Sequence, residues 1–196
     1  MVRVLDVRPE RARRAAVCAA IVLLAIALFV LVPSRACPQS DTTKAAAVER
    51  SSAPAAPLPR ISIATKKYGD IVIELYPAEA PRAVERILSL VRSGFYNDLR
   101  FHRVESYVIQ TGAHENDLAP IEGEMFSESL THEPGMVGMA RMPDDYDSAT
   151  TQFYICKKHL PLMNKEYTLF GKVIQGMDIV QKIKRGDVIE EIKVVE

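Results

Sequence analysis

An uninterrupted apolar run near the start of the chain constrains the fold more than any other feature. Residues 15–32 are 18 consecutive residues drawn only from Ala, Val, Cys, Ile, Leu and Phe. A helix of that length rises about 27 Å at ~1.5 Å per residue, which is close to the ~30 Å hydrocarbon thickness of a bilayer. A buried core helix of a soluble domain would carry polar residues on one face, and this run has none. The run therefore predicts a transmembrane helix or a secretory targeting segment.

The charges around this run predict its orientation. Five arginines lie within residues 1–14, whereas only Arg35 follows the run in the next ten residues. Because cytoplasmic flanks carry the excess of Lys and Arg, we expect a basic cytoplasmic leader and a lumenal or extracytoplasmic remainder. An uncleaved signal anchor is favoured, since leader and run are both long for a signal peptide. Secretion after cleavage near Ala36 is the alternative, and a mitochondrial presequence is less favoured because two acidic residues interrupt the leader.

The rest of the chain divides into a linker and a body. Residues 33–59 are predicted to form a Pro/Ala-rich disordered linker, because a stretch so rich in proline and alanine and without aromatic residues cannot bury enough apolar surface to fold. Residues 60–196 are long enough to form a domain with its own core. The chain is neutral, with 25 Lys+Arg against 25 Asp+Glu. Residues 1–36 carry an excess of basic over acidic residues, whereas residues 60–196 are mildly acidic, so nucleic-acid binding is not expected.

Periodicity in the body predicts mainly β structure. Residues 61–65 and 70–76 alternate apolar and polar side chains around a turn that ends at Gly69, which predicts a β-hairpin. Helices are predicted from Pro81 to Gly94 and at about 177–184. Eight short strands without regular βα alternation favour an antiparallel barrel or sandwich with helices at its ends. The other six strands are predicted at 99–104, 107–111, 136–140, 152–156, 168–173 and 188–195.

Common catalytic templates are missing from the sequence. The four histidines form no metal-type pair with one another or with Cys156, so no metal site is expected. The chain has neither a Gly-x-Ser-x-Gly elbow nor a Walker-type glycine loop. Cys156 stands in an apolar run and is interpreted as a packed core residue rather than a nucleophile.

Two predicted strands carry polar residues where apolar ones are expected. His102 and Arg103 interrupt residues 99–104, and Gln110 interrupts residues 107–111. Polar groups on core-like strands are costly unless they are paired or functional. A strand side that faces solvent also explains them, so these residues alone leave both interpretations open.

The same residues carry a resemblance to a known family. Phe101-His-Arg-Val104 followed by Val108-Ile-Gln-Thr-Gly112 resembles the signature strand pair of the cyclophilin-type peptidyl-prolyl cis–trans isomerases. The resemblance implies a cyclophilin-like eight-stranded antiparallel β-barrel capped by two α-helices, preceded here by one N-terminal transmembrane helix. Further family-like motifs follow in order at Tyr68–Leu75, Ala80–Tyr96, Glu124–Phe126, His132, Gly135, Met139–Ala140, Thr151–Ile155 and Phe170–Met177.

The resemblance implies rotation of X-Pro peptide bonds in client proteins. The barrier is ~18–20 kcal/mol because the nitrogen lone pair is delocalised. Lowering it requires a donor aimed at that nitrogen rather than a nucleophile, metal or cofactor. Arg103 matches the family's arginine in this role, and Gln110 matches the glutamine that holds the substrate backbone. The positions implied to bind substrate are Tyr107, Met139, Ala140, Gln152, Tyr154, Leu162, Met163 and Tyr167.

Several positions depart from the family's pattern. Tyr107 and Tyr154 stand where phenylalanine is usual, and each adds a hydroxyl that needs a hydrogen-bond partner. Arg141 replaces an asparagine, and Tyr167 replaces a histidine. Leu162 replaces a tryptophan, which implies weak cyclosporin binding. The alternative to an active isomerase is therefore a weakly catalytic or non-catalytic module that recruits Pro-containing partners at a membrane.

Overall fold

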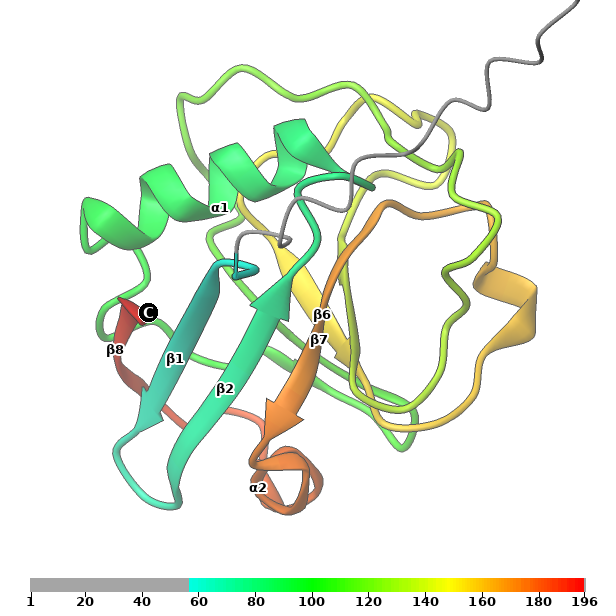
Figure 1. Ribbon diagram of the computed structural model, residues 1–196. Coiled ribbons are helices and arrows are strands. Elements are labelled where there is room, and N and C mark those ends of the chain that lie inside the picture. Colours follow the sequence, from blue (N-terminus) through cyan, green and yellow to red (C-terminus); the bar gives the residue numbers. More distant parts are fainter. Residues whose placement is uncertain (1–56, 196) are drawn as a thin grey trace, which may run out of the picture. The chain divides into compact units, whose positions relative to one another are not determined.

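The computed structural model describes residues 57–195 (Figure 1). The predicted leader, the apolar run of residues 15–32 and most of the predicted linker lie outside the described residues. Within residues 57–195, neither helix reaches the length and apolar content that crossing a bilayer requires.

The described residues form one antiparallel sheet of eight strands. Its strand order is β3-β4-β6-β5-β7-β2-β1-β8. The predicted strands are confirmed in number and order, and only the third begins much later than expected. The strands are β1 Arg60–Thr65, β2 Gly69–Leu75, β3 Arg103–Val104, β4 Val108–Thr111, β5 Met136–Met139, β6 Phe153–Cys156, β7 Leu169–Gln175 and β8 Ile189–Val195.

The sheet is a half-barrel, whereas the resemblance implied an eight-stranded β-barrel. Strands β3 and β8 are its two edges and do not pair with each other. The seam between them is spanned by an isolated bridge between Arg100 and Val188. Both backbone groups of Phe101 also bond to the loop before β8, at 3.0 and 2.9 Å. These bonds use the backbone of the residues before β3, which explains why the predicted strand 99–104 is reduced to two residues.

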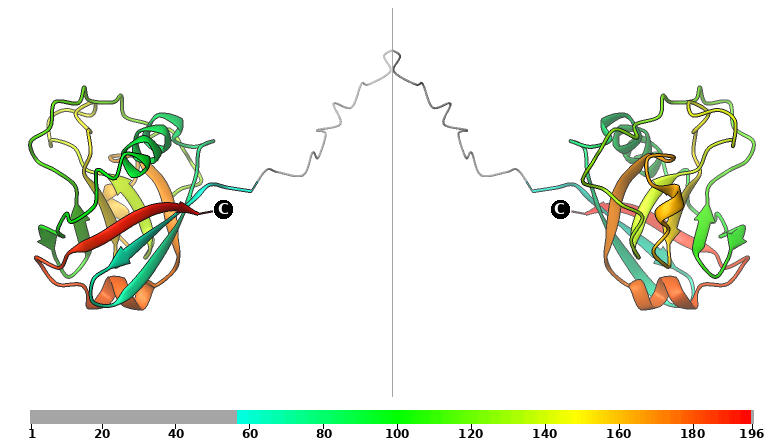
Figure 2. Two further views of the ribbon diagram at one scale, coloured as in Figure 1. Left: turned by 90° about the vertical axis from the view of Figure 1, so that its left-hand side faces the viewer. Right: turned by 90° about the vertical axis from the view of Figure 1, so that its right-hand side faces the viewer.

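Two α-helices lie at opposite ends of the half-barrel, as both views in Figure 2 show. Helix α1 spans Pro81–Arg92 and helix α2 spans Met177–Lys182, close to their predicted bounds. Pro81 opens α1 as predicted, because its missing N–H is not needed in the first turn. The buried face of α1 joins the inward side chains of the strands in the main core. The largest fully buried side chains of that core are Tyr96, Phe101, Phe153 and Phe170.

The N-terminus of α1 is capped by a carboxylate that is distant in sequence. Ala80 occupies the cap position and has no side chain that could accept a hydrogen bond. Glu124 instead accepts bonds from the backbone N–H groups of Arg82 at 3.0 Å and Ala83 at 2.9 Å. A negative group here satisfies free N–H donors and complements the helix dipole. The backbone N–H of Glu124 donates to the Thr168 hydroxyl at 2.7 Å, which links the helix to the residue before β7.

A second, smaller apolar cluster lies on the outer face of the sheet. Its buried members are Val108, Met136, Tyr154, Cys156 and Leu169. Each alternates along its strand with a residue of the main core, and successive side chains of a strand point to opposite faces. Cys156 is fully buried in this cluster, which confirms the interpretation of a packed core residue, and burial raises the pKa of its thiol to about 12.

Candidate active site

The candidate site begins where three neighbouring strands bring polar residues into register. Arg103 of β3 pairs with Gln110 of β4, and Gln110 pairs with Tyr154 of β6. Directly opposed residues on antiparallel strands present their side chains on one face. Nη1 of Arg103 donates to Oε1 of Gln110 at 3.3 Å, and Nε2 of Gln110 donates to Oε1 of Gln152 at 2.8 Å. These three side chains form a continuous polar chain over the outer face.

Tyr107 connects this polar chain to the outer apolar cluster. Its hydroxyl accepts a hydrogen bond from Nη2 of Arg103 at 2.8 Å, and its ring packs against the cluster. The Arg103 guanidinium is therefore held from two sides, although the side chain is 46 % exposed. Glu105 lies 4.0 Å from Nε of Arg103, but both side chains are so exposed that this ion pair contributes little.

Gln152 extends the polar chain toward two histidines. Its Nε2 lies 3.3 Å from the carbonyl oxygen of Ala113 and 3.2 Å from Nδ1 of His114. The rings of His114 and His102 are 4.9 Å apart between centroids. Burial and the neighbouring His114 lower the pKa of His102. Neutral imidazole is therefore the favoured form of His102, whose Nε2 is buried without a partner among the described residues.

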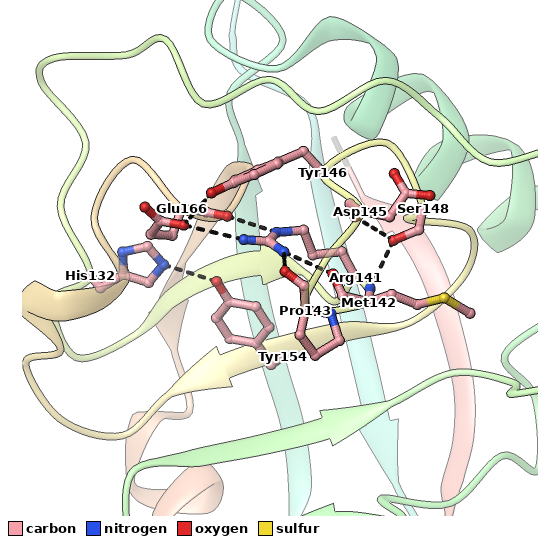
Figure 3. A network of polar contacts seen from close by, with 9 residues as sticks. All are labelled: His132, Arg141, Met142, Pro143, Asp145, Tyr146, Ser148, Tyr154 and Glu166. Atoms are coloured by element: carbon pink, nitrogen blue, oxygen red, sulfur yellow. Dashed lines mark hydrogen bonds and ion pairs between the residues drawn. The ribbon is translucent and has the colours of Figure 1, made fainter. Parts of the chain in front are cut away.

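Tyr154 directs its hydroxyl into a buried polar network beneath the site (Figure 3). Its oxygen lies 2.9 Å from Nε2 of His132, and Nδ1 of His132 lies 2.9 Å from Oδ1 of Asn164. The same Oδ1 accepts the backbone N–H of His132 at 2.8 Å, which fixes the orientation of the amide. Because this oxygen only accepts, Nδ1 carries the proton and the Tyr154 hydroxyl donates to Nε2. Both tyrosine hydroxyls thus have the hydrogen-bond partner that we expected: Arg103 for Tyr107 and His132 for Tyr154.

Gly138 makes room for the Tyr154 hydroxyl. The two residues are opposite each other in the pairing of β5 with β6. A Cβ at Gly138 would overlap the hydroxyl oxygen of Tyr154. A glycine in a strand often marks such a close approach. In this position the Tyr154 hydroxyl therefore leaves no room for a side chain at residue 138.

The remaining predicted site residues differ in how exposed they are and in which cluster they contact. Ala140, Met163 and Tyr167 are partly exposed and pack against the outer cluster beside Tyr107. Leu162 is 94 % exposed on the 3-10 helix η1, Pro161–Met163, so it contributes to the surface and not to an apolar floor. Met139 corrects our prediction: it is 1 % exposed and faces the main core, so its side chain is not available to a substrate. Its inward direction follows from the outward direction of the neighbouring Gly138.

The comparisons with known proteins agree with this fold. A family model described as "Cyclophilin type peptidyl-prolyl cis-trans isomerase/CLD" matches residues 60–196. The chain belongs to this family. It is 35 % identical over 139 residues to a peptidyl-prolyl cis-trans isomerase of Helicobacter pylori, with 67 % of this chain and 83 % of that protein covered. It is 41 % identical over 131 residues to the peptidyl-prolyl cis-trans isomerase cyp18 of Streptomyces antibioticus, with 59 % of this chain and 78 % of that protein covered.

Solved cyclophilins have the same fold. A Cryptosporidium parvum cyclophilin, crystallised in the presence of the dipeptide Ala-Pro, is 25 % identical with a TM-score of 0.62, and 70 % of this chain matches 99 % of it. The cyclophilin AquaCyp293 of Hirschia baltica has a TM-score of 0.63 at 23 % identity, with 70 % of this chain and 74 % of that protein covered. Family membership and the named relatives identify this cyclophilin as an enzyme of the peptidyl-prolyl cis-trans isomerase class.

The buried His132 is expected to make this cyclophilin less stable in acid. Burial lowers the pKa of His132 from its ordinary value of 6.5, so just below that pH the unfolded chain binds more protons than the folded one. The histidine's stabilising contribution is complete above the ordinary pKa and is lost as the pH falls through the lowered one. Urea titrations should show the free energy of unfolding falling as the pH drops below 6.5, by at most about 1.4 kcal/mol per pH unit for this one histidine.

The matching control is His132→Gln, which has no proton to gain over this range. Its unfolding free energy should depend less steeply on pH than that of the wild type, with a residual slope from His102, whose pKa is also lowered. Equal slopes in the two proteins would show that His132 does not titrate differently on folding.

Proposed function

We propose that this chain catalyses cis–trans rotation of X-Pro bonds in client proteins, with Arg103 as the catalytic residue and Gln110 as the residue that holds the substrate backbone. The observation that carries the proposal is the exposed Arg103 guanidinium, which Gln110 and Tyr107 fix at the edge of an apolar surface. The solved relative crystallised in the presence of Ala-Pro supports a proline-containing ligand of this kind.

The chemistry of rotation explains why an arginine suffices. In a planar peptide bond the nitrogen lone pair is delocalised, and twisting the bond localises it on nitrogen. An N–H donor aimed at that nitrogen therefore binds the twisted state more strongly than the planar state, and such differential binding is what accelerates a reaction. Rotation breaks no covalent bond, so positioned donors and an apolar surface are sufficient.

The neighbouring side chains suit the rest of such a substrate. Proline has an apolar ring and no N–H, and the partly exposed Tyr107, Met163 and Tyr167 offer apolar surface on the outer cluster, to which Tyr107 links Arg103. Gln110 uses one of its two amide hydrogens on Gln152, which leaves the other for a substrate carbonyl. Water displaced from this surface would strengthen the donors of Arg103.

An assay of X-Pro rotation in a tetrapeptide, read by a conformer-specific protease, tests the proposal. Uncatalysed rotation takes tens of seconds or longer, and we expect the rate to rise in proportion to the concentration of the chain. Peptide binding without acceleration would contradict catalysis. That outcome would favour the alternative, a binding module that recruits Pro-containing partners.

We also propose that residues 15–32 anchor the domain to a membrane, with residues 1–14 in the cytoplasm and the domain on the lumenal or extracytoplasmic side. The length of the apolar run and the excess of arginine before it support this orientation. N-terminal sequencing of the mature protein should then find a start at Met1 or Val2. A start near Cys37 would show instead that the run is a cleaved signal and that the enzyme is secreted.

A further inference from the structure

Arg141 lies between two loops beside the candidate site, and its side chain is only 6 % exposed. It directly follows Ala140 and begins the loop of residues 141–148 after β5. The facing loop, residues 164–168, connects η1 to β7 and carries Tyr167. Figure 3 shows the guanidinium at the centre of a network of polar contacts that joins these loops.

The guanidinium donates four hydrogen bonds. Nε donates to the carbonyl oxygen of Glu166 at 2.9 Å, and Nη2 donates to its carboxylate at 3.3 Å. Nη1 donates to the carbonyl oxygens of Met142 at 2.8 Å and Pro143 at 2.7 Å. A buried cation is tolerated only when its donors are paired in this way. The arginine therefore binds the backbone of its own loop and of the facing loop at the same time.

The guanidinium lies over two tyrosine rings. Its Cζ lies 4.1 Å from the ring centroid of Tyr146 and 4.6 Å from that of Tyr167. The planar, weakly hydrated guanidinium suits stacking on aromatic faces. The Tyr146 hydroxyl donates to the carboxylate of Glu166 at 2.9 Å, so Glu166 accepts from both the arginine and this tyrosine.

Tyr167 also packs against a residue of the site. The rings of Tyr167 and Tyr154 pack edge to face, with centroids 5.8 Å apart and an interplanar angle of 87°. Tyr167 thus packs against both Arg141 and Tyr154. Ala140 directly precedes Arg141 in the sequence, and its backbone N–H donates to the carbonyl oxygen of Gln152 at 2.9 Å. Arg141 is therefore connected to the site through both Tyr167 and Ala140.

We propose that Arg141 is a positioning residue, whose stacking and hydrogen bonds fix Tyr167 and Ala140 in the orientation that receives a proline-containing segment. The inference rests on the proposed function, because these two residues matter only if this face binds substrate. Arg141 acts through them and not on the rotating amide. Its loss should therefore weaken binding and leave the rate of rotation in the bound state nearly unchanged.

Substitutions of Arg141 in the full chain test this role. For Arg141→Met we expect the Kd of an Ala-Pro-containing tetrapeptide, measured by calorimetry, and the KM to rise about tenfold, or about 1.4 kcal/mol. The kcat should stay within about twofold. Arg141→Lys keeps the charge but not the planar fork, so it should bind almost as weakly. The control Tyr146→Phe keeps the ring and removes only the bond to Glu166, and it should bind within about twofold of the wild type.

The outcomes separate the possible explanations. An unchanged Kd in both Arg141 variants, even with a lowered Tm, would mean that the arginine only stabilises the two loops, and would overturn the proposal. A lowered kcat at constant Kd would also contradict it. Circular dichroism at the assay temperature shows whether each variant is folded, and Arg141→Lys preserves the test if Arg141→Met is not. Wild-type binding without rotation would refute the proposed catalysis while the titrations still decide the role of Arg141.

Discussion

Replacing Arg103 by alanine is expected to lower kcat/KM for an X-Pro peptide by at least about 100-fold, the effect typical of removing one donor to transition-state charge. The Tm should change little, because Arg103 is 46 % exposed and its loss leaves no buried charge behind. Rates from the protease-coupled assay and thermal unfolding curves of the same preparation provide both values.

Two further variants sharpen this expectation. Arg103→Lys keeps the positive charge but loses the rigid planar fork of N–H donors that Gln110 and Tyr107 hold in place, so it should lose about tenfold or more. Arg100→Ala is a matched control, since Arg100 is an exposed arginine three residues earlier whose Nη1 donates to the carbonyl oxygen of Gly186. It should retain activity within about twofold. Wild-type activity in Arg103→Ala would remove this residue from the mechanism.

Replacing Gly138 by alanine is expected to destabilise the domain by about 2–3 kcal/mol, as overpacking of a filled core does. The new Cβ would overlap the hydroxyl of Tyr154, which cannot move away without breaking its bond to His132. Urea unfolding of Gly138→Ala and wild type measures the difference.

A double-mutant cycle identifies the cause of that loss. Tyr154→Phe should itself cost about 1–3 kcal/mol, because it leaves Nε2 of the buried His132 without its donor. Since it also removes the oxygen that the new Cβ would meet, Gly138→Ala combined with Tyr154→Phe should be destabilised by less than the sum of the two single losses. Strictly additive losses would show that the glycine and the hydroxyl are not coupled.

The elements of this fold could be predicted because they are encoded locally. Alternating residues mark the first hairpin, and Pro81 followed by apolar residues at helical spacing marks α1. The shortening of the strand predicted at 99–104 could not be predicted, because it depends on bonds to the loop before β8. The sequence also did not show which face of the sheet Met139 points to, because all four residues of β5 are buried and their pattern does not alternate between polar and apolar.

The candidate site was predicted only in part, for a similar reason. Arg103 and Gln110 are seven residues apart in adjacent strands, so their contact follows from a local strand pair. The contact of Tyr154 with His132 joins residues 22 positions apart, and the bond of Arg141 to Glu166 joins residues 25 positions apart. Such contacts depend on how distant loops meet in the fold. The sequence marked Arg141 as a departure from the family, and only the structure shows what it binds.

Exchange NMR of an Ala-Pro peptide at equilibrium shows whether Arg103 drives rotation at this face, and it needs no protease. With the wild-type chain we predict exchange between cis and trans signals much faster than the uncatalysed tens of seconds. With Arg103→Ala the exchange should return close to the uncatalysed rate while the peptide still binds. Equal acceleration by both proteins, or binding without acceleration by the wild type, would contradict the account.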